Sequence, residues 1–152
     1  MYPHARLMTV SLCMCLGGLQ AMAQKPVTWR FSAVKVDAGT YLVHLTARID
    51  PGWHVYSQTQ PESAVALPTK IQFTANPLVV LSGKPGEVGQ VVHWSDAASG
   101  LAANQYQNKV DFVQKVTVKG NIKVNVTGNL TFQVCTDEMC LPPETIPFSV
   151  PL

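Results

Sequence analysis

The chain has 152 residues, of which 47% are hydrophobic and only 13% are charged, and its formal net charge at pH 7 is +2. A chain of this length can form one globular domain with its own hydrophobic core. It contains no run or stripe of basic residues, which excludes nucleic acid and anionic membrane surfaces as expected partners.

The first 23 residues have the pattern of a secretory signal peptide. An apolar run covers residues 7–19, and Ala21-Met22-Ala23 is a small-x-small cleavage site. The apolar run is too short to span a bilayer. We therefore expect cleavage after Ala23, an exported domain over residues 24–152, and no membrane insertion of the mature chain.

The mature chain has the two-residue period of β-strands, and no window shows a helical period. The alternation is clearest over residues 40–49, where every second residue from Tyr41 to Ile49 is apolar. Eight or nine short strands separated by turns predict an all-β fold, an antiparallel β-sandwich of immunoglobulin-like type. We expect strands at residues 27–36, 40–49, 53–56, 70–75, 78–82, 90–94, 109–119, 123–134 and 145–150, with a loop at 58–68, a turn-rich piece at 83–89 and a small polar segment at 95–100.

The segment Cys135-Thr-Asp-Glu-Met-Cys140 contains the two cysteines of the mature chain. In an oxidising compartment such a pair is expected to form a disulfide. If the alternation of the preceding strand continues, Cys135 lies on the polar face with residues 131 and 133, away from the core. Pro142 and Pro143 then stop regular strand pairing. The pair is therefore expected at the open end of a hairpin-like turn, within reach of another protein.

Two functions remain open for this cysteine pair. A disulfide that closes a loop of about six residues stabilises a fold by only about 2 kcal/mol, against nearly 5 for a 100-residue loop. That small contribution favours thiol:disulfide exchange over a structural role. The alternative is a secreted β-sandwich binding module with a structural disulfide, whose reduction potential would lie below roughly −300 mV.

The histidines offer no convincing metal site. His44, His54 and His93 fall on separate predicted strands without the spacing of zinc ligands, and a Cys-x4-Cys pair is not a zinc-knuckle spacing. His44 lies on the polar face of its strand and is expected to be solvated. We expect neither a metal nor a cofactor beyond the cysteine pair itself.

The segment from Cys135 to Thr145 resembles the active-site segment of the N-terminal periplasmic domain of the thiol:disulfide interchange protein DsbD and of related stand-alone domains. The resemblance extends to Pro51-Gly-Trp-His-Val-Tyr56 and to Val110-Asp-Phe-Val-Gln114. It implies an immunoglobulin-like fold in the periplasm. It also implies a protein-disulfide reductase that passes reducing equivalents from a thioredoxin-like donor to oxidised periplasmic proteins.

The same resemblance implies roles for individual residues. Cys140 would attack partner disulfides, and Cys135 would resolve the mixed disulfide. His54 and Tyr56 match positions where the family has aromatic side chains beside its cysteines. The family also covers its cysteines with a cap loop that carries an aromatic residue. The matching stretch here, residues 95–100, has none, so either the preceding Trp94 takes that role or the disulfide is less shielded than in the family.

The chain shows neither the membrane domain nor the thioredoxin-like domain that supplies electrons in the family, so we expect the donor to be a separate protein. We also expect a monomer. Asp137 and Glu138 lie between the cysteines, and their carboxylates disfavour a neighbouring thiolate. They predict thiol pKa values at or above the ordinary value of about 8.5. His54 is the residue expected to act in the opposite direction by supplying positive charge.

Overall fold

The computed structural model describes residues 25–152, so the predicted signal peptide lies outside the described residues. Within residues 25–152 every regular element is a β-strand, and no helix there is long and apolar enough to cross a membrane. The strands are β1 (Val27–Asp37), β2 (Thr40–Ile49), β3 (His54–Tyr56), β4 (Lys70–Phe73), β5 (Val79–Val88), β6 (Val91–Asp96), β7 (Leu101–Tyr106), β8 (Lys109–Val118), β9 (Asn125–Phe132), β10 (Val134–Cys135) and β11 (Glu144–Pro151).

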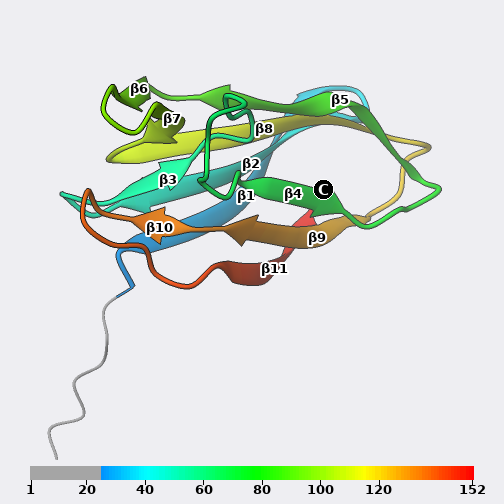
Figure 1. Cartoon of the computed structure of the whole chain (residues 1–152). Helices are drawn as coiled ribbons and strands as arrows, with labels where there is room; N and C mark the ends of the chain where they lie inside the picture. Colours follow the sequence, from blue (N-terminus) through cyan, green and yellow to red (C-terminus); the bar gives the residue numbers. More distant parts are fainter. Residues whose placement is uncertain (1–24) are drawn as a thin grey trace, which may run out of the picture.

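The strands form an immunoglobulin-like antiparallel β-sandwich (Figure 1). One layer is the sheet β1-β2-β8-β5, and the sheet β11-β9-β4 lies across the core from it. A further sheet, in the order β10-β3-β7-β6, occupies the end of the sandwich where β9 passes into β10. Every named strand pair is antiparallel, which confirms the predicted fold class.

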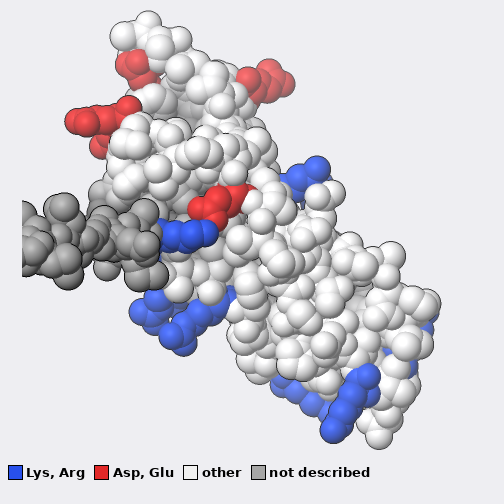
Figure 2. Space-filling model, turned by 90° about the horizontal axis from the view of Figure 1, so that it is seen from below, with Lys and Arg blue, Asp and Glu red and all other residues white. Residues whose placement is uncertain are grey.

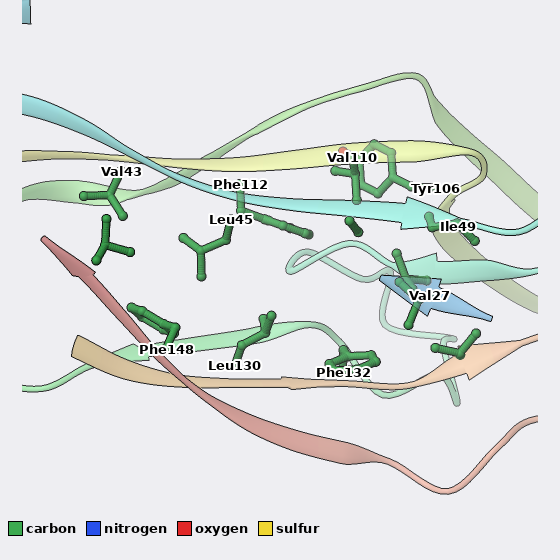
Figure 3. Close-up of a cluster of buried hydrophobic side chains, with 14 of the residues drawn as sticks. Val27, Val43, Leu45, Ile49, Tyr106, Val110, Phe112, Leu130, Phe132 and Phe148 are labelled. Atoms are coloured by element: carbon green, nitrogen blue, oxygen red, sulfur yellow. The ribbon is translucent and has the colours of Figure 1, made fainter. Parts of the chain in front are cut away.

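The core lies between β2 and β8 on one side and β9 and β11 on the other (Figure 3). In β8 and β9 every second side chain is buried, which is the two-residue period that the sequence predicted. Phe112 and Leu45 face Leu130 and Phe148 across the core, and all four side chains are almost completely buried. Alternating apolar residues therefore place one face of each strand in a shared core and leave the other face to the solvent.

The close contact between β9 and β11 depends on a glycine. A Cβ atom on Gly128 would lie 2.3 Å from the backbone oxygen of Gln72 and 2.5 Å from the ring of Phe148. No real Cβ makes contacts that short, so a side chain at this position would push the Phe148 ring out of the core. The glycine thus positions β9, the strand that leads into the cysteine segment.

The predicted and observed strands differ by one or two residues at several ends, and two differences are larger. Residues 83–89 were expected to form a turn-rich piece. Strand β5 instead continues to Val88 after a register shift between Ser82 and Gly86, because β8 pairs with it on both sides of this irregularity. Strand β7 was not predicted at all. Its sequence, LAANQY, has no period of two and no β-branched residue, and it becomes a strand by pairing with β6 and β3.

Candidate redox site

The chain changes sheets immediately before Cys135. Strand β9 ends at Phe132, and after Gln133 the two-residue strand β10 pairs with β3 in another sheet, so that Cys135 lies opposite His54. Cys135 is turned away from the main core, as predicted, but it is completely buried rather than on a solvated face. The prediction failed on this point because residues distant in sequence cover that face of β10.

The two sulfur-bearing residues differ sharply in exposure. Cys135 has no exposed surface and packs in a small cluster with Tyr56 and Ala103, separate from the main core. Cys140 is exposed, and a disulfide joins it to Cys135. The disulfide therefore joins one exposed cysteine, at the surface of the site, to one buried cysteine.

A pocket of about 400 Å³ opens beside Cys140. It brings together β3, the β6–β7 hairpin, the loop between β3 and β4, and the connection between the cysteines. Trp94, which is 41% exposed, forms part of its wall, as do Val65, Leu101 and Met139. Six of the seven residues singled out from the sequence line this pocket. The seventh, Cys135, is buried and is joined by the disulfide to Cys140, which lines it. The seven residues are His54, Tyr56, Trp94, Cys135, Asp137, Glu138 and Cys140.

The loop between β3 and β4, residues 57–69, is held over this part of the fold by Glu87 of β5. The Glu87 carboxylate accepts hydrogen bonds from the Ser57 hydroxyl at 2.8 Å, the Gln58 backbone amide at 2.7 Å and the Tyr106 hydroxyl at 2.6 Å. Burial and this carboxylate raise the pKa of Tyr106, which keeps its hydroxyl a donor. Further along the loop, Ala66 packs against the cluster that contains Cys135.

His54 and Tyr56 form a paired unit at the base of the pocket. Their rings meet edge to face with centroids 5.3 Å apart, and His54 Nε2 lies 3.3 Å from the Tyr56 hydroxyl. Burial lowers the pKa of His54, although the Asp137 carboxylate opposes the shift. Burial also raises the pKa of Tyr56. Both groups are therefore neutral at pH 7, which contradicts the expectation that His54 supplies positive charge to the site.

The charges around the pocket are acidic. Asp137 and Glu138 line it and are exposed, whereas no Lys or Arg of the described chain is among its lining residues. On the face shown in Figure 2, Asp and Glu side chains lie at one end and Lys and Arg at the other, with both kinds between them. A thiolate in this pocket thus has the carboxylates of Asp137 and Glu138 as neighbours. Positive charge on a partner would be attracted to this site.

The other two histidines of residues 25–152 lie elsewhere. His44 was expected to be simply solvated, but its Nδ1 lies 2.7 Å from Asp111, whose other oxygen accepts a hydrogen bond from Thr46 at 2.8 Å. His93 Nδ1 lies 2.7 Å from the Asn104 side-chain oxygen. Within residues 25–152 no three His, Cys, Asp or Glu side chains are placed to hold a metal ion.

Sequence reasoning missed several residues that shape the site. Val65 and Ala66 come from a loop without any period, and Leu101 comes from the unpredicted strand β7. Glu87 lies in the segment expected to be a turn. No local pattern identifies these residues, because their role depends on contacts with residues distant in the sequence; the hydrogen bonds of Glu87 to Ser57, Gln58 and Tyr106 span 19 to 30 positions.

The fold and the site together define a class of protein. It is a β-sandwich that carries a disulfide beside an open pocket, in which one cysteine is exposed and the other is buried. Residues 20–151 match the family described as thiol:disulfide interchange protein DsbD, N-terminal. The chain belongs to this family and is a thiol:disulfide interchange domain. Among curated proteins, none matches the chain.

Three of the solved structures with a similar fold are from Neisseria meningitidis and Proteus mirabilis. The reduced N-terminal domain of DsbD from Neisseria meningitidis is 18% identical, with a TM-score of 0.51, and the match covers 77% of this chain and 79% of that one. The N-terminal periplasmic domain of ScsB from Proteus mirabilis is 20% identical, with a TM-score of 0.54, over 88% of this chain and 49% of that one. A complex between the DsbD N-terminal and PilB N-terminal domains of Neisseria meningitidis gives 16% identity and a TM-score of 0.52, over 81% of this chain and 80% of that one.

Proposed function

We propose that this protein is an exported, monomeric domain that passes reducing equivalents between a thioredoxin-like donor and oxidised periplasmic proteins through Cys135 and Cys140. The observation that carries the proposal is the difference in exposure between the two cysteines. A purely structural disulfide gains nothing from presenting one sulfur at the mouth of a pocket. An exchanging disulfide needs one sulfur that a partner can reach and another that only its neighbour can reach.

The exposure difference supports the following roles for the two cysteines. In the reduced domain the Cys140 thiolate attacks a sulfur of the partner disulfide, forms a mixed disulfide and releases one partner thiolate. The Cys135 thiolate then attacks the Cys140 sulfur, forms the Cys135–Cys140 bond and releases the second partner thiolate. Two electrons pass to the partner, which takes up two protons to become a dithiol. Reduction by the donor runs the same steps backwards, with the donor thiolate attacking Cys140.

The neighbouring residues support these steps. His54 lies opposite Cys135 in the β3–β10 pairing and its imidazole is neutral at pH 7, so it is a suitable acceptor for the proton of the resolving thiol. Trp94 and Met139 give the pocket exposed apolar walls for a partner's cysteine-bearing segment. The complex of a DsbD N-terminal domain with a PilB N-terminal domain supports a partner that is a separate domain.

The test is to trap the mixed disulfide. Reduced Cys135→Ala protein keeps the Cys140 thiol but cannot resolve, so we mix it with a thioredoxin-like protein that keeps a single active-site cysteine, activated as a mixed disulfide with thionitrobenzoate. The Cys140 thiolate should displace thionitrobenzoate and accumulate a covalent 1:1 complex that dithiothreitol releases. The matched control, Cys140→Ala, keeps only the buried thiol and should form little complex. Equal trapping by both variants would refute the assigned roles.

The alternative function, a binding module with a structural disulfide, makes the opposite prediction. Its bond should have a reduction potential below roughly −300 mV and should not exchange with thioredoxin-like proteins. Equilibrating the wild-type protein in redox buffers and quantifying free thiols by mass spectrometry measures that potential. A potential in the range of thioredoxins, together with trapping through Cys140, supports exchange.

A further inference from the structure

The connection between the two cysteines is closed by hydrogen bonds that do not involve sulfur. The Thr136 backbone amide donates to the Met139 carbonyl at 2.8 Å, and the Leu141 amide donates to the Val134 carbonyl at 2.9 Å. Cys135 and Cys140 lie between these two bonds as an antiparallel bridge. The backbone therefore holds the cysteines opposite each other independently of the disulfide.

The side chain of Thr136 fixes the inside of this turn. Its hydroxyl oxygen accepts hydrogen bonds from the backbone amides of Glu138 at 3.2 Å and Met139 at 3.1 Å. The hydroxyl hydrogen can be donated to the Met139 carbonyl, 3.4 Å away. One side chain thus satisfies two amides that a four-residue connection leaves without strand partners, in the way that Ser and Thr hydroxyls stabilise tight turns.

We propose that Thr136 is a positioning residue that keeps the turn closed after the disulfide has been reduced. With the turn closed, the Cys135 thiol stays within bonding reach of the Cys140 sulfur. The resolving step is then fast, and the partner is released before it can be captured by another thiol. This inference rests on the proposed exchange function and adds to it a residue that carries no sulfur and no charge.

The effect can be measured as a redox equilibrium. One protein disulfide and two glutathione thiols give one protein dithiol and one glutathione disulfide, so atoms and electrons balance. In Thr136→Val the disulfide still closes the turn covalently, but the dithiol gains open conformations. The two hydrogen bonds are lost from both redox states, but only the dithiol can relax by opening the turn. The equilibrium constant for reduction should therefore rise, by at most about fivefold for two hydrogen bonds at the weak end of the usual range.

Two matched controls isolate the hydroxyl at this position. Thr136→Ser keeps the oxygen and should restore the wild-type equilibrium constant. Thr131→Val removes a hydroxyl that bonds to Thr145 outside the turn and should leave the constant unchanged. Hydrogen exchange of the reduced proteins adds a direct reading, because the amides of residues 138 and 139 should exchange faster in Thr136→Val only. Circular dichroism checks that each variant is folded.

The outcomes separate this inference from the proposed function. Equal equilibrium constants for the wild type, Thr136→Val and Thr136→Ser would overturn the role of Thr136, even if Cys140 traps partners as proposed. Measurement in both glutathione and dithiothreitol buffers gives a constant whether the potential is high or low. A shift in Thr136→Val that Thr136→Ser reverses supports the positioning role even if no partner is trapped.

Discussion

Loss of the disulfide should cost this domain little stability, and the cost should depend on which cysteine is replaced. The bond joins residues only five positions apart. In the chain-entropy account, opening a loop of that size destabilises the fold by about 2 kcal/mol. Small domains have unfolding free energies of about 5–15 kcal/mol. Reduction, or Cys140→Ser, should therefore leave the sandwich folded at room temperature.

Replacing the other cysteine should cost more because its surroundings are different. Cys135 has no exposed surface and packs against Tyr56, Ala66 and Ala103. A serine hydroxyl there loses its hydration, which adds about 1–3 kcal/mol to the cost of the lost bond. Cys140 is exposed, so a serine hydroxyl at that position stays hydrated. The expected total costs are about 2 kcal/mol for Cys140→Ser and about 3–5 kcal/mol for Cys135→Ser.

Urea unfolding followed by Trp fluorescence measures both costs, with the reduced wild type as the reference that lacks the bond but keeps both side chains. The double variant Cys135→Ser/Cys140→Ser should unfold cooperatively, with a stability near that of Cys135→Ser. Equal costs for the two single variants would contradict the burial argument. Unfolding of Cys140→Ser at room temperature would show instead that the bond is a structural requirement.

Three further predictions concern the residues around the pair. Glu87→Ala removes the acceptor that holds the loop at residues 57–69, so it should destabilise the fold by about 2–3 kcal/mol. It should also speed the alkylation of Cys135 in the reduced protein, which peptide mapping measures. Burial lowers the pKa of His54 below 6.5, so at acid pH the unfolded chain binds a proton more readily than the folded chain does. The free energy of unfolding should therefore be highest above pH 6.5 and fall below it. The urea midpoint measures this fall, and an equal fall in His54→Phe would refute the assignment to His54. Asp137→Asn/Glu138→Gln should react faster with iodoacetamide at pH 7 than the wild-type dithiol, and an unchanged rate would show that these carboxylates do not disfavour the thiolate.

Two features could be predicted from the sequence. They are the strands whose two faces differ in polarity, and the position of the cysteine pair after such a strand. In β2 the apolar residues recur at every second position, and in β8 they do so except at the buried Gln114. The turn between Cys135 and Cys140 could also be predicted from neighbouring residues, because Pro142 and Pro143 end strand pairing directly after it. These features depend on residues within a few positions of one another.

The exposure of the two cysteines could not be predicted from the sequence. Cys135 is buried in a cluster with Tyr56 of β3 and Ala103 of β7, and Ala66 of the loop at residues 57–69 packs against that cluster. Glu87 of β5 holds the beginning of this loop. The charge state of His54 was decided in the same way, because burial and not its sequence neighbours lowers its pKa. Alternation along a strand tells which face a side chain occupies, but accessibility depends on what distant segments place above that face. That is why the sequence located the reactive pair, and the fold made its two sulfurs unequal.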